Sequence, residues 1–308
     1  MLRATLISLS ESRALRAVAE RSAFGQRVSA RFVAGTQIED AIRAAGALNR
    51  AGLSVSLDNL GENVTTAEEA RRSAQLYDQL LSEISSRGLG ANVSVKLTHM
   101  GIDVDPQLAR DHVSALVAKA AAMTPPNFVR VDMEGSAYTQ RTLDLVRELH
   151  RKAGNQRCIG AVIQSYMRRS QDDIKNLISE GIRVRLCKGA YKEPPEIAFQ
   201  KKSEVDGNYV SLMKILLKSG IYHGLATHDE KIIREAQAFA TQERISRDAF
   251  EFQMLYGIRR DLQRSLVREG WRMRVYVPFG TEWYPYLMRR LAERPANLLF
   301  VARNLIRQ

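Results

Sequence analysis

The chain has 308 residues, of which 45% are apolar and 26% charged, a composition typical of a globular protein with a large core. Its net charge of +12 is spread along the chain without an aromatic–basic motif, so nucleic acid is not an expected partner. No run approaches the roughly 20 apolar residues that cross a bilayer, and Cys158 and Cys187 lack metal-ligand or redox spacing, which together indicate a cytoplasmic protein.

The first 31 residues are rich in Arg, Ser and Ala, and in this they imitate an organelle-targeting peptide. Glu11 and Glu20 are unusual in such a peptide, however, and apolar residues recur at helical spacing through Leu6, Leu9, Leu15 and Val18. We therefore expect a folded helix here and a second one over residues 38–48. Residues 1–50 would form accessory helices outside the main fold.

From residue 50 onward, short apolar runs alternate with longer segments of helical periodicity. The predicted strands cover residues 54–58, 93–97, 128–134, 159–166, 183–187, 222–227, 249–255 and 273–278. The predicted helices cover residues 66–86, 107–122, 139–151, 170–180, 195–218, 230–241, 259–269 and 282–293. Such alternation gives parallel strands joined by right-handed crossovers, and eight strands favour a closed (β/α)8 TIM barrel. We predict a single domain over residues 1–308, with the barrel in residues 51–308.

Polar side chains gather at the C-terminal ends of the predicted strands, where barrel enzymes carry out their chemistry. In chain order these candidates are Asp58, Lys96, Asp132, Glu134, Gln164, Arg185, Lys188, Tyr191, Thr227, His228, Asp229, Gln253 and Leu255, followed after the eighth strand by Tyr286, Arg289, Arg290 and Glu293. No metal site is expected among them.

Lys96 lies between Val95 and Leu97 in an apolar strand, so in a barrel it faces the interior or the site. A buried ammonium needs an anionic partner, because an unpaired buried charge is costly. His228 is the weaker signal, since a lone histidine after a strand is more often a hydrogen-bonded structural residue than a catalyst.

Arg289 and Arg290 form the sharpest local signal. Adjacent helix residues point about 100° apart, so the two guanidiniums cannot share one solvated face. Tyr286 and Glu293 lie three residues before and four residues after Arg289, and therefore on its side of the helix. Such a group is suited to clamping separate anionic groups, although a solvated basic helix end remains the alternative.

The familiar nucleotide and metal motifs are absent from the sequence. It contains no Gly-x-Gly-x-x-Gly after a strand, no Walker A motif and no His-Glu-x-x-His. This argues against a Rossmann-bound dinucleotide, a P-loop nucleotide and a zincin-type metal site.

Several motifs together resemble the proline dehydrogenase family, including the catalytic domain of bifunctional proline-utilisation flavoproteins. They are Asp-Asn-Leu-Gly-Glu at 58–62, Val-Ser-Val-Lys-Leu at 93–97, Val-Asp-Met-Glu at 131–134, Ile-Gln at 163–164, Arg-Leu-Cys-Lys-Gly-Ala-Tyr at 185–191, Thr-His-Asp at 227–229, Phe-Gln-Met-Leu-Tyr-Gly at 252–257 and Tyr-Leu-Met-Arg-Arg-Leu-Ala-Glu at 286–293. The terminal Tyr-x-x-Arg-Arg with its downstream Glu is the most specific of these.

The resemblance implies a distorted barrel with a C-terminal helix over the strand ends and non-covalently bound FAD. The reaction would oxidise L-proline to Δ1-pyrroline-5-carboxylate by hydride transfer to FAD, and the electrons would pass to a membrane quinone. The basic charge would then suit peripheral contact with the inner face of the cytoplasmic membrane.

The resemblance also implies roles for individual residues. Arg185, Asp132 and Tyr191 would be catalytic. The substrate would contact Lys96, Arg289, Arg290, Tyr286, Leu255 and Tyr191, with Asp58 near Arg289 as an ion-pair gate. The cofactor would contact Asp132, Gln164, Arg185, Lys188, Gly189, Ala190, Lys202, Thr227, His228, Asp229, Gln253, Arg290 and Glu293. Asp229 departs from the family pattern, because many relatives have Asn there.

Two alternatives from other classes are kept. The first is a barrel lyase that forms a Schiff base through Lys96 or Lys188, which needs a desolvated neutral amine and no flavin. The second is a basic nucleic-acid-binding module, which predicts salt-sensitive binding and gives no reason for an interior lysine.

Overall fold

The computed structural model describes residues 22–61 and 63–293, in which eight parallel strands close into a barrel. The strands are β1 (Ser54–Asn59), β2 (Ala91–Val95), β3 (Val129–Val131), β4 (Ile159–Gln164), β5 (Arg183–Cys187), β6 (His223–Ala226), β7 (Phe250–Leu255) and β8 (Met273–Phe279). They pair in chain order, and β8 pairs with β1 to complete the ring. The predicted (β/α)8 barrel is therefore confirmed.

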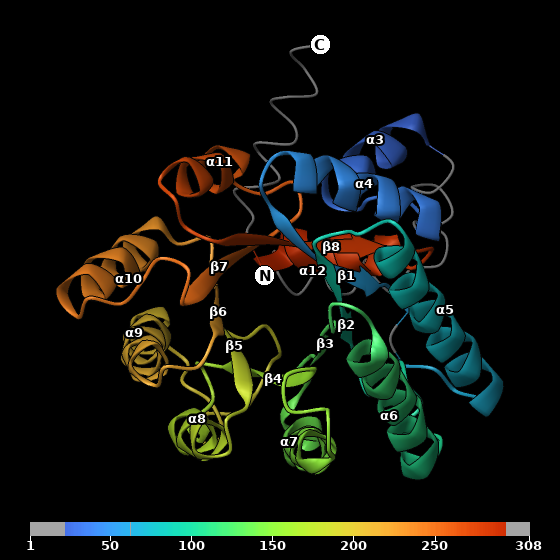
Figure 1. Cartoon of the computed structure of the whole chain (residues 1–308), viewed down its shortest axis with the longest axis horizontal. Coiled ribbons are helices and arrows are strands. Elements are labelled where there is room, and N and C mark those ends of the chain that lie inside the picture. The colour runs from blue at the N-terminus through green and yellow to red at the C-terminus, as the bar shows by residue number, and fades with distance from the viewer. Residues whose placement is uncertain (1–21, 62, 294–308) are drawn as a thin grey trace.

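Helices follow the strands and surround the barrel (Figure 1). They are α3 (Ala23–Phe32), α4 (Ile38–Arg50), α5 (Ala67–Ser86), α6 (Pro106–Ala122), α7 (Ser136–Arg151), α8 (Ser170–Ser179), α9 (Lys202–Lys218), α10 (Glu230–Gln242), α11 (Arg260–Arg268) and α12 (Trp283–Glu293). The accessory helix expected over residues 38–48 is present as α4, which packs against β1 and β8. The helix expected before residue 22 lies outside the described residues.

The prediction of a helix from residue 195 is wrong for residues 195–201, because α9 begins only at Lys202. One turn does form after Pro194, whose carbonyl accepts from the backbone N–H groups of Ile197 and Ala198. The next backbone groups then pair with the segment after β4: Phe199 donates to Tyr166, and Arg168 donates to Ile197. These groups are no longer available for a helical ladder, so the turn does not propagate.

The strands alternate sharply between an apolar outer face and a polar inner face. On β7, Phe250 and Phe252 are buried with Trp271 in an aromatic cluster, whereas Glu251 and Gln253 take the intervening positions. On β5, Val184 and Leu186 likewise flank Arg185, and all three are buried. Successive side chains of a strand point to opposite faces, so the outer residues make the core beneath the helices and the polar ones fill the barrel.

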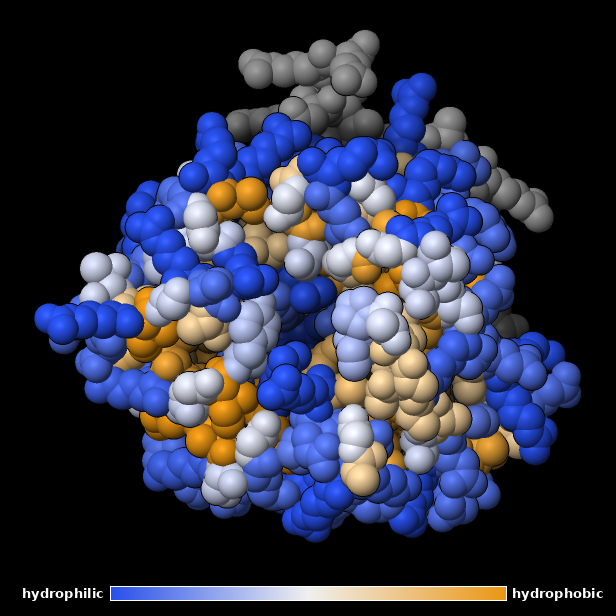
Figure 2. Space-filling view, viewed as in Figure 1, coloured by the Kyte–Doolittle hydropathy of each residue, from blue (hydrophilic) through white to orange (hydrophobic). Residues whose placement is uncertain are grey.

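The C-terminal helix packs over the end of β1. Trp283, Tyr286 and Leu287 of α12 form a buried cluster with Phe32 of α3 and with Leu60, which directly follows β1. The expected helix over the strand ends is therefore present. The space-filling view shows a mainly hydrophilic face that is hollowed near its middle (Figure 2).

His223 at the start of β6 is buried on the outer face of the sheet, in register with Phe250, and supplies a pH test of the fold. Its Nδ1 accepts from the backbone N–H of Val184 at 2.9 Å, and its Nε2 lies 2.9 Å from Ser219 Oγ. Burial, together with Arg130 and Arg183, lowers the pKa of His223 to about 3. The unfolded chain therefore takes up a proton near pH 6.5 that the folded chain refuses until about pH 3.

Stability should consequently fall as the pH drops from 6.5 towards 3, by about 1.4 kcal/mol per pH unit from this group. His223→Gln keeps an acceptor for Val184 but does not titrate, so its free energy of unfolding should decline less steeply over that range. Urea unfolding of both proteins between pH 7 and pH 4 measures the difference. Parallel pH curves for the two proteins would contradict the assignment.

Candidate active site

Arg185 on β5 stands at the centre of the polar interior. Its Nη1 donates to Asp132 Oδ1 at 2.7 Å and its Nε donates to Gln253 Oε1 at 2.6 Å. Its Nη2 donates to Ser94 Oγ at 3.0 Å and to Ser56 Oγ at 3.2 Å. These partners lie on β1, β2 and β7 and just after β3, so five strands converge on one guanidinium.

The contacts leave Arg185 little freedom. A guanidinium has five N–H groups, and the described residues occupy four of them. The ring of Tyr276 adds a cation–π contact, with the guanidinium carbon 5.1 Å from the ring centre. A preorganised cation with one N–H of Nη1 remaining is suited to a ligand that presents an acceptor.

Lys96 directly follows β2 and confirms the expectation that it needs an anion. Its Nζ lies 3.0 Å from Asp58 Oδ1 and 3.7 Å from Asp132 Oδ2. The Tyr276 hydroxyl is 3.4 Å away. Two carboxylates hold the ammonium in its charged form, which argues against the Schiff-base alternative at this lysine because that chemistry requires a neutral amine.

Tyr276 on β8 is a functional candidate that the sequence analysis missed. Its hydroxyl donates to Asp132 Oδ2 at 2.7 Å, and burial raises the pKa of this phenol well above its usual value, so the proton stays on the oxygen. The available signal was alternation: Arg274 and Tyr276 interrupt the apolar residues of β8 at every second position, which points both side chains into the barrel.

Asp58 at the end of β1 is only 1% exposed and is held from two sides. Its Oδ1 accepts from Lys96 and, at 3.4 Å, from the hydroxyl of Tyr77 on α5. Burial raises the pKa of Asp58 despite the opposing effect of Lys96. The expected gate between Asp58 and Arg289 stays a prediction, because the side chain of Arg289 lies outside the described part of the chain.

Gln164 at the end of β4 offers an acceptor to a ligand. Its Nε2 donates weakly to the carbonyl of Met133 at 3.5 Å, but its buried Oε1 has no partner among the described residues. A buried polar atom without a partner is costly, and a bound group with an N–H donor at this point would satisfy it.

Thr227 and His228 follow β6 and connect it to β7. Thr227 Oγ1 accepts from the backbone N–H of Asp229 at 3.1 Å. His228 Nε2 accepts from the backbone N–H of Leu255 at 2.9 Å, which fixes the end of β7. This nitrogen of His228 therefore has the structural, hydrogen-bonded role that the sequence favoured for this residue.

Lys188, Lys202 and Asp229 form a second charged group beside the strand ends. Lys188 Nζ lies 2.6 Å from Asp206 and 2.9 Å from Asp229, and Lys202 pairs with Asp206 as well. Asp229 also caps α10 by accepting from the backbone N–H of Lys231. Carboxylates thus hold both lysines at the beginning of α9, where a phosphate-bearing ligand would find cations and helix N–H groups.

Gly189, Ala190 and Tyr191 follow β5 in the loop above it. Gly189 has φ +107°, and a Cβ there would lie 2.2 Å from the ring of Tyr166, so only glycine lets the backbone pass this ring. Tyr191 is 38% exposed, an unusual state for a large aromatic side chain here. Leu255 at the end of β7 is half-buried.

The remaining candidates are on α12. Tyr286 is buried in the cluster with α3. Arg289, Arg290 and Glu293 belong to the same helix, but their side chains lie outside the described part of the structure, so their expected roles stay predictions.

These residues would suit a flavin cofactor. The buried oxygen of Gln164 would accept from an N–H donor of such a group, and the remaining N–H of Arg185 would donate to one of its acceptors. An anionic part of the ligand would have to share Lys188, which follows β5, and Lys202, which begins α9, with Asp206 and Asp229. Within residues 22–61 and 63–293, no group of three His, Cys, Asp or Glu side chains is arranged to hold a metal ion.

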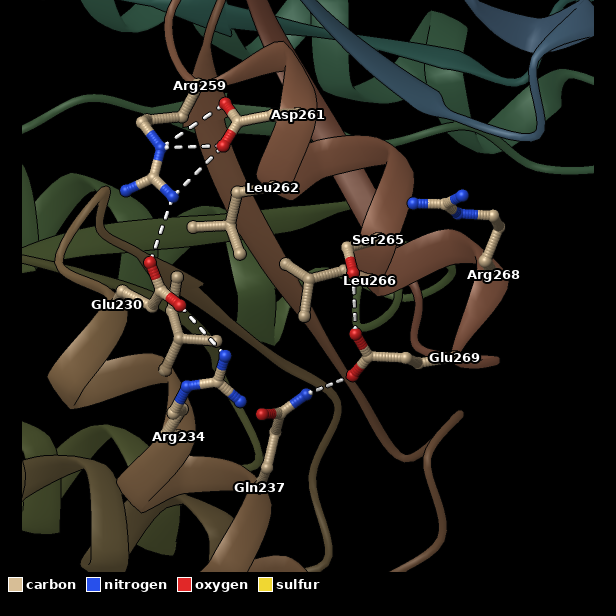
Figure 3. A pocket seen from close by; sticks show the side chains of 11 residues that line it. Glu230, Arg234, Gln237, Arg259, Asp261, Leu262, Ser265, Leu266, Arg268 and Glu269 are labelled. Atoms are coloured by element: carbon tan, nitrogen blue, oxygen red, sulfur yellow. Dashed lines mark hydrogen bonds and ion pairs between the residues drawn. The ribbon is translucent and has the colours of Figure 1, made fainter.

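A separate recess of about 250 Å³ lies outside the barrel between α10 and α11 (Figure 3). Its charges largely satisfy one another: Glu230 pairs with Arg234 at 2.8 Å and with Arg259 at 3.0 Å, and Glu269 accepts from Gln237 and Ser265. The strand ends are therefore the better candidate for a ligand site.

The chain is similar in sequence to proteins that are already known. A sequence model described as proline dehydrogenase matches residues 41–303. Proline dehydrogenase 1 of Bacillus subtilis subsp. natto is 40% identical over the whole of both chains, and proline dehydrogenase of Deinococcus radiodurans is 40% identical over 90% of this chain and 89% of its own.

The fold is also found in solved structures. The crystal structure of proline utilization A (PutA) from Bdellovibrio bacteriovorus, inactivated by N-propargylglycine, superposes with a TM-score of 0.81 and 26% identity over 87% of this chain. The present chain spans only 32% of that longer protein.

Asp132 is the carboxylate on which this site depends, because it contacts Arg185, Lys96 and Tyr276 together. Asp132→Asn leaves Arg185 buried beside a neutral amide, so the free energy of unfolding should fall by about 3–5 kcal/mol. Asp144→Asn on α7 is the matched control, since its carboxylate is 60% exposed and lies 4.0 Å from Arg147; it should change stability by less than about 0.5 kcal/mol. If urea unfolding shows the same loss of unfolding free energy in both variants, Asp132 does not stabilise the site as described.

Proposed function

The chain belongs to the proline dehydrogenase family, and we propose that it oxidises L-proline to Δ1-pyrroline-5-carboxylate, the first step of proline catabolism, with FAD as cofactor and a quinone as the final electron acceptor. The observation that carries the proposal is the meeting of Lys96, Asp132 and Arg185 at the C-terminal ends of the strands. Oriented charges of both signs in one buried place are typical of a site that holds a charged substrate against a reactive cofactor.

The substrate carboxylate is assigned to Lys96, Arg289 and Arg290. Lys96 alone cannot bind it well, because Asp58 and Asp132 already balance its charge. A third carboxylate in this place needs additional cations, and we assign that role to the adjacent arginines of α12. Tyr191, Leu255 and Tyr286 are assigned to the apolar ring of proline. Fixing the carboxylate and the ring together presents the carbon next to nitrogen in one orientation.

The cofactor is assigned to the strand-end residues, with Asp132 and Arg185 also acting in catalysis. When bound, FAD supplies the redox chemistry by accepting a hydride from the ring carbon next to nitrogen. The residues assigned to hold it are Asp132, Gln164, Arg185, Lys188, Gly189, Ala190, Lys202, Thr227, His228, Asp229, Gln253, Arg290 and Glu293. The fixed charge of Arg185 would favour electron density on a flavin bound beside it.

The related PutA supports an amino-acid site. That protein is inactivated by N-propargylglycine, a compound that shares a secondary amine and an α-carboxylate with proline. We assign the same pair of recognition features to the present chain.

Quinone reduction calls for an approach to the membrane. None of the described helices combines the length and the apolarity required to cross a bilayer. We propose a peripheral contact with the inner face of the cytoplasmic membrane, supported by the net charge of +12, which attracts anionic lipid.

Anaerobic addition of L-proline to the FAD-loaded protein tests the proposal. The visible flavin bands should bleach, and a quinone added in vesicles of anionic lipid should restore them. D-proline serves as the control, because it presents the same groups with the opposite hand. Flavin bands that persist in excess L-proline would refute the proposed function, and bleaching without recovery on quinone would refute the proposed acceptor alone.

Arg290→Lys tests the assignment of the substrate carboxylate. An ammonium is a point charge and cannot reproduce the planar fork of a guanidinium, so the proline KM should rise by about tenfold or more. Arg268→Lys on the exposed side of α11 is the matched control and should leave the KM unchanged. Steady-state kinetics with unaltered KM in Arg290→Lys would remove this residue from the substrate site.

A further inference from the structure

Gln253 lies between a cation and an anion inside the barrel. Its Oε1 accepts from Arg185 Nε at 2.6 Å, and its Nε2 donates to Glu251 Oε1 at 2.6 Å. Both side chains of this strand are buried, with 3% and 4% of their surface exposed. The amide therefore uses both of its ends within the protein.

The two contacts fix which way the amide of Gln253 faces. A guanidinium can only donate hydrogen bonds and a carboxylate can only accept them. A reversed amide would place its NH2 group against the N–H of Arg185 and its oxygen against the carboxylate of Glu251, so both contacts would become repulsive. Glu251 thus selects the orientation that holds Arg185.

Glu251 is itself firmly anchored. Arg274 Nε donates to its Oε1 at 2.7 Å, and the Tyr222 hydroxyl donates to its Oε2 at 2.9 Å. Burial raises the pKa of Glu251, but Arg274 and the three hydrogen bonds outweigh this effect, and the pKa is lowered. Arg274 Nη1 in turn donates to the carbonyl of Val55 at 2.6 Å. The carboxylate is therefore ionised and is held, through Arg274, by the backbone of β1.

We propose that Glu251 is a positioning residue for the reaction: it orients the amide of Gln253, which in turn holds the guanidinium of Arg185 at the strand ends. The inference rests on the proposed function, in which Arg185 faces the cofactor. Glu251 lies two residues before Gln253 on the inner face of β7 and acts on Arg185 only through Gln253.

A purely structural role would be to neutralise Arg274, and the two roles predict different variants. Glu251→Gln retains an oxygen that accepts from Gln253 but removes the charge. Glu251→Leu removes both the acceptor and the charge. Positioning requires the acceptor, whereas neutralisation requires the charge.

The measurement is the limiting rate of flavin reduction by L-proline under anaerobic conditions, with the flavin midpoint potential as a second readout. In Glu251→Gln the limiting rate of flavin reduction should stay within about threefold of the wild-type rate. Glu251→Leu should be slower by about tenfold to a hundredfold, since small misplacements of a catalytic group have effects of this size. Its half-saturating proline concentration should change less than twofold, and its midpoint potential should move to more negative values.

Glu251→Leu leaves Arg274 buried without its carboxylate, so a second variant protects the test against misfolding. Glu251→Leu with Arg274→Met replaces both members of the ion pair by apolar groups, an exchange that proteins tolerate well. This double variant should fold and still show the slow reduction and the shifted potential. Glu180→Leu on the outside of the barrel, where the carboxylate pairs with Arg147 and Arg151, is the control and should reduce like wild type.

Two results would overturn the inference. One is a double variant whose flavin is reduced at the wild-type rate. The other is a Glu251→Gln variant whose rate of flavin reduction is as low as that of Glu251→Leu. Both comparisons presuppose that the wild-type flavin bleaches with proline, so a failure of the proposed function is seen separately in the wild-type protein.

Discussion

The site depends on carboxylates that are buried inside the barrel together with Lys96, Arg185 and Arg274. Asp132 pairs with Arg185 and Lys96 and accepts a hydrogen bond from Tyr276. Glu251 pairs with Arg274 in the layer below. Removing one partner of such a pair leaves an uncompensated charge in a largely buried place. The polar side chains inside the barrel therefore hold one another in place, and residues deeper in the barrel set the geometry of the strand-end site.

The backbone makes room for this interior through small residues. Barrels of this type are usually filled by branched apolar side chains, whereas here long polar ones take their place. A Cβ on Gly224 would lie 2.4 Å from Gln253 Nε2, and one on Gly160 would lie 2.8 Å from Arg130 Nη1. Gly224 pairs with Arg185 across neighbouring strands, so the missing side chain opens space beside the central guanidinium.

Much of the fold was accessible from the sequence, because alternating apolar runs and helical periodicity count the strands directly. The need of Lys96 for an anion was also accessible, since a lysine between Val95 and Leu97 cannot stay unpaired. Which anion it meets was not, because that choice depends on where β3 ends. The strand stops at Val131, and Glu134 turns away to bind Thr98 at 2.6 Å. Tyr276 and Glu251 were missed because polar residues within strands were weighed only at the strand ends.

The most direct measurement is a crystal structure of the FAD-loaded protein with a proline analogue that cannot be oxidised. The proposed function predicts that the carboxylate of the analogue lies within hydrogen-bond distance of Lys96 Nζ and of both arginines of α12, while Lys96 keeps its contacts with Asp58 and Asp132. A carboxylate bound away from Lys96, with those arginines directed elsewhere, would contradict the assignment of the strand ends as the site of proline oxidation.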